Sequence, residues 1–241
     1  MTMSMARLGL GAVAALALLA GCERAETAPA EEIGKAAEEA LVDPNANDMP
    51  AAAGPYAPRD TCDEIEGSRA FRVRLEKVVA DRDVEGLKAL AADDVVLDFG
   101  GGMGAQELEM RLSDPEWALW DELDQLLRLG CSANKQGGIT IPWYADQQME
   151  GVDAANGVIV TGEDVPLLDA PKADAQEVAI VSWDVVSLEA FKPDAEYQQV
   201  VAVDGTTGYI RTDRLRSLLD YRVIASKRNG KWSITSFVAG D

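Results

Sequence analysis

The sequence predicts an α+β protein built from an α-rich domain, a small β-barrel and a C-terminal β-hairpin. Three observations carry this prediction. Apolar residues recur at helical spacing from residue 71 to 127, short β-rich segments follow from residue 157, and Asn229-Gly230 separates two more near the C-terminus. We therefore expect three folded parts: an α-rich domain over residues 59–150, a barrel over residues 157–218 and a hairpin over residues 219–241.

The N-terminal residues lie outside these folded parts. Residues 8–20 form an apolar run after a single positive charge. This run is shorter than the about 20 residues that a membrane span needs, and it is typical of a signal peptide, which we place at residues 1–21. From Glu23 to Pro58 the chain is rich in Ala, Glu, Pro and Asp. Such a segment buries too little apolar surface to offset its ordering entropy, so we expect residues 22–58 to be a disordered tether.

The end of the apolar run, Leu19-Ala20-Gly21-Cys22, resembles the lipobox of bacterial lipoproteins. The resemblance implies cleavage before Cys22, lipidation of its sulfur and acylation of its new amino end. Several acyl chains anchor a protein far more firmly than one chain does. Because Glu23 rather than Asp follows the cysteine, the resemblance favours the outer membrane, with the protein facing the periplasm. The alternative is an ordinary cleaved signal peptide in which Cys22 has no role.

Charge and residue usage exclude several classes of function. The chain carries 42 acidic and 22 basic residues, for a formal net charge of -20. Such a field repels nucleic-acid phosphates and anionic lipid surfaces, so we expect no nucleic-acid partner and membrane attachment only through the lipid. The chain contains no histidine, which removes Ser-His-Asp and Cys-His catalysis and histidine zinc sites. We expect no cofactor and no metal.

Two cysteines, Cys62 and Cys131, remain when Cys22 is set aside. In an oxidising envelope compartment an even pair most often forms a disulfide, so we expect a bond between them. The alternative is a redox or nucleophilic thiol, but neither a CxxC spacing nor a histidine supports it.

The α-rich domain is expected to contain helices and two strands. Residues 71–79 have the spacing of a buried helix face, and Asp83 is a suitable N-cap for a second helix. The segment Val95–Phe99 predicts a strand, and the glycines at 100–104 a turn with positive φ values before a helix over residues 105–112.

A further helix is expected to begin at Asp114-Pro115-Glu116, which offers a capping acid and a first-turn proline. Its buried stripe is expected to consist of Trp117, Trp120, Leu123, Leu126 and Leu127. Ile139–Ile141 predicts a second strand after this helix.

Short β-rich segments separated by Pro, Gly and Asp predict the barrel: 158–160, 178–181, 185–188, 199–203 and 208–210. The stretch Val158 to Leu218 resembles bacterial Src-homology-3-like domains, through the loop at 165–171, the hairpin Asp204-Gly205-Thr206-Thr207-Gly208-Tyr209-Ile210 and the short turn at 213–215. The resemblance implies a groove that binds a peptide. Its aromatic side chains would be Trp183, Tyr197 and Tyr209, at least one of which we expect in the barrel core.

The flanking parts resemble the nuclear-transport-factor-like α+β fold. Residues 71–129 are similar to its helical first half, and residues 221–234 to its last two strands. This resemblance implies that the barrel is inserted into an α+β domain whose sheet uses residues 95–99, residues 139–141 and the final hairpin. The whole sequence also resembles an uncharacterised family of α-proteobacterial envelope proteins, a resemblance that implies no activity.

These observations predict a non-catalytic, lipid-anchored envelope protein whose barrel binds a peptide, peptidoglycan or a protein partner. One alternative is an enzyme or small-ligand binder in the α+β part that uses Asp94, Asp98 and Glu107, because carboxylates about 5–9 Å apart can perform glycosidase chemistry. Another is a structural role in which the barrel rigidifies an assembly.

Overall fold

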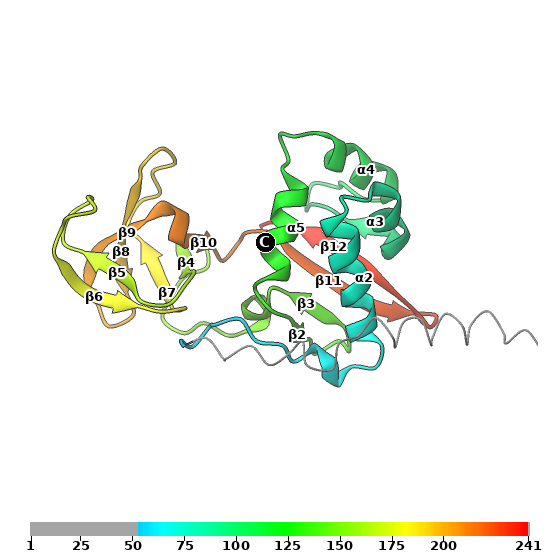
Figure 1. The fold of residues 1–241 in the computed structure, drawn as a ribbon, viewed down its shortest axis with the longest axis horizontal. Coiled ribbons are helices and arrows are strands. Elements are labelled where there is room, and N and C mark those ends of the chain that lie inside the picture. The colour runs from blue at the N-terminus through cyan, green and yellow to red at the C-terminus, as the bar shows by residue number, and fades with distance from the viewer. Residues whose placement is uncertain (1–52, 241) are drawn as a thin grey trace, which may run out of the picture. The chain divides into compact units, whose positions relative to one another are not determined.

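The computed structural model describes residues 53–240, which adopt the expected α+β fold (Figure 1). The predicted signal peptide, the lipidation site Cys22 and most of the predicted tether lie outside the described residues. The described strands form two sheets, one of five strands in the order β1-β12-β11-β3-β2 and one of seven in the order β10-β4-β7-β8-β9-β5-β6.

The five-stranded sheet joins the two ends of the described chain. The predicted hairpin is confirmed: β11 (Arg222–Arg228) and β12 (Lys231–Val238) pair around Asn229-Gly230. Both turn residues have positive φ, 52° and 81°, as a two-residue hairpin turn requires. β11 pairs antiparallel with β3 (Ile139–Ile141), which pairs with β2 (Ser132–Ala133), and β12 pairs parallel with β1 (Ala91–Val96). The sheet therefore contains the predicted strand 139–141 and the predicted hairpin, whereas the strand predicted at 95–99 shares only residues 95 and 96 with β1.

Four helices accompany this sheet. Figure 1 shows α2 (Ser68–Ala80) and α5 (Leu119–Leu127) lying across its face. α3 (Val84–Leu90) begins at the predicted N-cap, where the Asp83 carboxylate accepts the Gly86 N–H at 3.0 Å, and α4 is Ala105–Ser113. Phe71 of α2 stacks on Trp232 of β12, with ring centroids 5.7 Å apart. The helices and the sheet bury one core, whose largest side chains include Phe71, Leu75, Leu87, Leu108, Leu123, Leu126, Ile139 and Ile141.

The predicted disulfide is present and closes this core. Cys62, in the short 3-10 helix η1 (Cys62–Glu64), is bonded to Cys131, just before β2. Both residues are fully buried, and the bond joins positions 69 residues apart. A second 3-10 helix, η2 (Trp143–Asp146), follows β3.

The seven-stranded sheet is antiparallel throughout and lies between β3 and β11 in the chain. Its strands are β4 (Gly157–Val160), β5 (Val165–Leu168), β6 (Glu177–Val181), β7 (Val185–Leu188), β8 (Tyr197–Ala202), β9 (Thr207–Arg211) and β10 (Leu215–Ser217), with the 3-10 helix η3 (Thr212–Arg214) before the last. This sheet has its own apolar core, which includes Val160, Leu167, Val200 and Ile210. We call residues 157–218 the β unit and the remaining described part the α+β unit.

Two predicted elements are displaced. The first strand spans Ala91–Val96 rather than 95–99, so Asp98 and Phe99 lie beyond it, and Gly101 and Gly104 supply the expected positive φ values. The helix predicted from Asp114 begins only at Leu119, because residues 114–118 form a hydrogen-bonded turn and Ala118 has a φ of 48°. Trp117 is consequently not on the buried stripe but 42% exposed.

The last residues of the predicted tether also differ from expectation. Ala57 is almost fully buried, and the Tyr56 N–H donates to the Trp183 carbonyl at 2.8 Å. The Ala53 N–H donates to the Glu163 carboxylate at 2.9 Å. Residues 53–58 therefore pack against the folded part, although their composition resembles that of the preceding segment.

Candidate functional site

The candidate site lies on the outer face of the β unit and is organised by the register of β8 and β9. Gln198 and Val200 of β8 point into the unit and are almost fully buried, so their neighbour Tyr197 points outward. Tyr197 pairs with Arg211 of β9, which shares its face. Although it points outward, Tyr197 is only 7% exposed, because other parts of the unit cover its ring.

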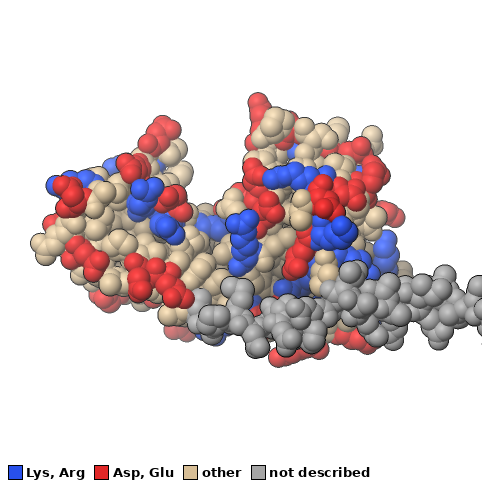
Figure 2. Space-filling model, in the orientation of Figure 1, with Lys and Arg blue, Asp and Glu red and all other residues tan. Residues whose placement is uncertain are grey.

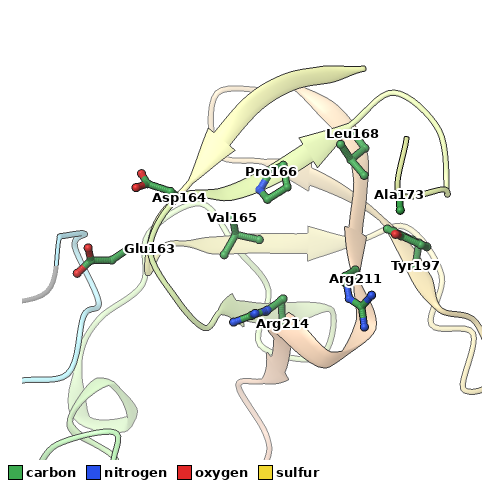
Figure 3. Close-up of a pocket in the computed structure, with 9 residues that line it drawn as sticks. All are labelled: Glu163, Asp164, Val165, Pro166, Leu168, Ala173, Tyr197, Arg211 and Arg214. Atoms are coloured by element: carbon green, nitrogen blue, oxygen red, sulfur yellow. The ribbon is translucent and has the colours of Figure 1, made fainter. Parts of the chain in front are cut away.

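A pocket of about 290 Å³ lies beside this tyrosine. Its walls combine four apolar or aromatic side chains with two guanidinium groups and two carboxylates: Val165, Pro166, Leu168, Tyr197, Arg211, Arg214, Glu163 and Asp164, together with Ala173. In Figure 3, Arg211 and Arg214 lie on one side of Val165. The residues Leu168, Ala173 and Tyr197 lie at one end of the pocket, and Glu163 and Asp164 lie at the other. We call this pocket the groove.

The two arginines of the groove differ in how their charges are satisfied. Arg211 donates to both oxygens of Asp213, at 3.0 and 2.9 Å, and lies 3.4 Å from Glu196. The Asp213 carboxylate accordingly raises the pKa of the Arg211 guanidinium above its ordinary value, and the guanidinium lowers the pKa of the Asp213 carboxyl. The exposed Arg214 guanidinium makes no ion pair with any carboxylate of the described chain within 4.0 Å, and only the carbonyl of Arg214 is engaged, by Thr161.

At the acidic end of the groove, one of the two carboxylates already has a hydrogen-bond partner. Glu163 accepts the hydrogen bond from Ala53 described above, whereas the side chain of Asp164 is exposed and its backbone N–H donates to Ser182. Figure 2 shows acidic and basic side chains interspersed over the face in view. The arrangement therefore offers local charges of both signs around an apolar floor, which suits a ligand that has apolar and ionic groups close together.

Only one of the three predicted aromatic residues lines the groove. Tyr197 does so. Trp183 instead packs against a separate buried cluster, formed by Leu129, Trp143, Tyr144 and Ile159. Tyr209 lies on the outer face of β9, where its hydroxyl is 3.4 Å from the Gln199 amide oxygen. Sequence reasoning named all three as candidates and expected at least one in the barrel core, because it could not assign the faces of the strands.

Sequence reasoning also missed the arginines. Arg211 precedes the 3-10 helix η3 between β9 and β10, and Arg214 is the last residue of that helix. A signal was present in the sequence, since two cations stand close together in a strongly acidic chain.

The carboxylates considered for catalysis are held in ion pairs with arginines. Asp98 and Glu107 both accept hydrogen bonds from Arg111, and Asp94 lies 3.1 Å from Arg228. The Arg111 guanidinium, helped by the Gly102 N–H, lowers the pKa of Asp98 to about 2. Asp98 is therefore ionised at neutral pH and unsuited to act as a general acid.

Metal-donor side chains within residues 53–240 gather at one place, where Asp60 lies beside Cys62 and Cys131. Both sulfurs there belong to the disulfide and cannot act as thiolate ligands. Within the same residues no helix is both long and apolar enough to cross a membrane.

Comparisons with known proteins give few matches. No protein-family model matches the sequence, and no curated protein matches it. A solved structure of a protein of unknown function with a cystatin-like fold, from Nostoc punctiforme, is 16% identical, with a TM-score of 0.24 over 70% of this chain and 84% of that one. A calcium/calmodulin dependent protein kinase II association domain assigned in Xanthomonas campestris is 12% identical, with a TM-score of 0.26 over 78% of this chain and 97% of that one. The α+β class stated above rests on this chain's own helices and sheets.

Proposed function

We propose that this protein is a non-catalytic peptide-binding protein of the bacterial envelope, anchored by lipid at Cys22, and that the groove of the β unit is its binding site. The ligand is a peptide segment, either of the cell wall or of an envelope protein. The observation that carries this proposal is the composition of the groove, which is lined both by the buried Tyr197 ring and by the exposed Arg214, whose guanidinium makes no ion pair within 4.0 Å in the described chain.

The strand arrangement supports a Src-homology-3-like identity for the β unit. The hairpin β5–β6 forms one end of the sheet, and η3 separates β9 from β10, where the family resemblance placed a short turn. Src-homology-3 domains bind extended peptides in aromatic-lined grooves. Tyr197 is 7% exposed, so its ring offers such a ligand a small contact area, but a ring held by packing has few rotamers to lose on binding.

The ionic groups of the groove favour a ligand that carries charges of its own. The Arg214 guanidinium makes no ion pair within 4.0 Å in the described chain, and guanidinium groups bind carboxylates well and in a defined geometry. Asp164 at the other end is exposed, and Figure 3 shows its carboxylate pointing away from Val165 and Pro166, so an ammonium group could pair with it only at the rim. Peptides with a free carboxylate and a basic group meet both requirements, and the stem peptides of peptidoglycan belong to this class.

The alternative of a carboxylate enzyme has less support. Its three residues, Asp94, Asp98 and Glu107, each pair with an arginine, and Arg111 holds two of them in one network. A catalytic pair needs one carboxyl group with a raised pKa, whereas the pKa of Asp98 is lowered. The geometry therefore favours binding over catalysis.

Retention of the full-length protein on purified peptidoglycan, and on immobilised envelope proteins, tests this proposal. We expect Tyr197→Ala to abolish retention. The matched control is Tyr209→Ala, which removes an outward-facing tyrosine of the same sheet that does not line the groove, and which we expect to retain binding. The groove would be refuted as the binding site if both variants were retained equally. It would also be refuted if the wild-type protein were retained neither on peptidoglycan nor on the envelope proteins.

Lipid anchoring is tested separately. Cys22→Ala is expected to leave the protein unprocessed and to remove radiolabelled palmitate from it. Normal membrane retention, with no acyl chain on the wild-type protein, would contradict this part of the proposal while leaving the groove untouched.

A further inference from the structure

A second surface, on the α+β unit, exposes large apolar side chains. Phe99 is 60% exposed, Met103 58%, Met110 56% and Trp117 42%. Single exposed apolar residues are ordinary on protein surfaces, but a contiguous group of them marks an interaction site. Whether these four residues form one surface therefore decides their significance.

Arg111 contacts Trp117 directly and lies beside the residues that precede Phe99 and Met103 in the chain. Its guanidinium lies over the Trp117 ring, 4.4 Å from the centroid. It also donates a hydrogen bond to Asp98, which precedes Phe99 in the chain. It lies so close to Gly102, which precedes Met103, that a Cβ on this glycine would overlap the guanidinium. Met110 adjoins the same area, because it lines a shallow hollow with Asp114, whose carbonyl accepts the Trp117 N–H at 3.3 Å. We call these four side chains around Arg111 the apolar surface.

The apolar surface is held in place by buried polar contacts. The Arg111 side chain is only 8% exposed and donates to the Glu107 carboxylate at 2.8 Å and to the Leu97 carbonyl at 3.2 Å. Asp98 in turn accepts the N–H groups of Gly100 and Gly102, at 2.7 and 2.8 Å, and so fixes the loop that carries Phe99 and Met103. A preorganised surface loses little conformational entropy when a partner binds.

The charge around the apolar surface is negative. Arg111 pairs with two carboxylates there, Asp98 and Glu107, and Lys88 pairs with Glu109, which lines the hollow beside Met110. Asp114 and Glu116 add two further carboxylates. Asp114 and Glu116 are exposed, and no lysine or arginine of the described chain lies within 4.0 Å of either. Apolar centres with a charged rim are typical of protein interfaces, in which the rim selects a partner of opposite charge.

We propose that the apolar surface is a docking site for a second protein, which presents a basic segment with large apolar side chains beside its lysines or arginines. The apolar side chains of the partner cover Phe99, Met103 and Trp117. A cationic side chain lies along Met110 and pairs with Asp114. This site is independent of the groove, and the two would allow one protein to hold two ligands.

A random peptide library displayed on phage tests the proposal against the full-length protein. We expect clones that bind the wild-type protein and not the Trp117→Ser variant to be enriched in Lys or Arg next to Leu or an aromatic residue. A synthetic peptide from such a clone should lose about tenfold or more in affinity for both Trp117→Ser and Phe99→Ser, as hot-spot residues do. Circular dichroism establishes that both variants fold, which their exposed positions favour.

Three controls separate this site from the rest of the molecule. Phe191→Ser removes a phenylalanine of the β unit that is 63% exposed and should leave the affinity unchanged. Tyr197→Ala removes the groove and should also leave it unchanged. The double variant Asp114→Asn/Glu116→Gln should weaken binding about threefold or more at low ionic strength and less at high salt.

Several outcomes would overturn the proposal. Selection of no Trp117-dependent clone, or of acidic ones, would exclude a basic partner. Dimerisation in sedimentation experiments that Trp117→Ser abolishes would show that a second copy of this chain covers the surface. Trp117-dependent binding to phosphatidylcholine vesicles would show that lipid covers it.

Discussion

Arg111 in the α+β unit and Arg214 beside the groove carry the same guanidinium in opposite surroundings. Arg111 is buried and donates to two carboxylates and a carbonyl while an indole covers its face. Arg214 is exposed and makes no ion pair within the described chain. Burying a charge is costly unless partners satisfy it fully, so the contacts of Arg111 belong to the fold. Arg214 keeps its capacity to pair with a ligand.

This difference separates an arginine whose donors serve the fold from one that the proposed function uses for binding. Residue type alone does not, since both arginines stand in a chain where carboxylates are abundant. The distinguishing property is whether the donors of the side chain are already used. The same criterion applies to the carboxylates, because those considered for catalysis are engaged by arginines, whereas Asp164 is exposed.

The largest expected effect concerns the disulfide, which belongs to the α+β unit alone. Replacing both cysteines by serine removes a link between residues 69 apart. The chain-entropy relation gives a loss of about 4 kcal/mol in the free energy of unfolding. Urea unfolding followed by tryptophan fluorescence measures this loss. Ligand binding by the groove should persist below the transition, and a loss under about 1 kcal/mol would contradict the entropic role of the bond.

The next effect compares the two arginines directly. Arg111→Ala leaves Asp98 and Glu107 without their cation and uncovers Trp117, so the free energy of unfolding should fall by about 2 kcal/mol or more. Arg214→Ala removes an exposed side chain and should change it by less than about 0.5 kcal/mol. Thermal unfolding of both variants at neutral pH gives the comparison. Equal losses would show that Arg214 stabilises the fold to the same extent that Arg111 does.

Much of the fold could be predicted because local signals agreed with the final packing. Asp83 caps α3, Asn229-Gly230 turns the last hairpin, and the apolar spacing of α2 matches its buried face. The start of α5 could not be predicted in the same way. Asp114-Pro115-Glu116 satisfies the local rules for a helix start, but the turn it forms brings Trp117 over Arg111, a contact between separate elements.

The site was less predictable than the fold for a similar reason. The sequence identified the β unit and its aromatic residues, and the register of β8 then showed that Tyr197 lines the groove. Trp183 follows β6, and its packing against Trp143 depends on a cluster contributed by distant parts of the chain. Whether Arg214 is available to pair with a ligand depends on which carboxylates lie near it in the fold. Its position in the sequence does not contain that information.

A smaller effect concerns affinity rather than stability. Arg214→Ala should weaken binding of a carboxylate-bearing peptide by about tenfold, as expected for a charged hydrogen bond, without a change in melting temperature. Arg214→Lys should recover part of the affinity, because lysine keeps the charge but not the planar fork. Isothermal titration with a peptide retained by the groove measures both. Unchanged affinity in Arg214→Ala would place the ligand carboxylate elsewhere.

The smallest effect asks whether Asp98 responds to the charge of Arg111. The Arg111 guanidinium lowers the pKa of Asp98 from 3.8 to about 2 in the folded protein. The folded state therefore favours the ionised carboxyl, and its contribution to stability is present above about pH 4 and is lost as the pH falls towards 2. The wild-type protein should lose more stability over this interval than Asp98→Asn does. Asp194→Asn, which removes an exposed carboxylate far from Arg111 in the sequence, should behave like the wild type. The opposite outcome is that Asp98→Asn loses as much stability over this interval as the wild-type protein does. In that case Arg111 is held by its stacking on Trp117 and its bond to Glu107, and its pair with Asp98 does not contribute to the free energy of unfolding.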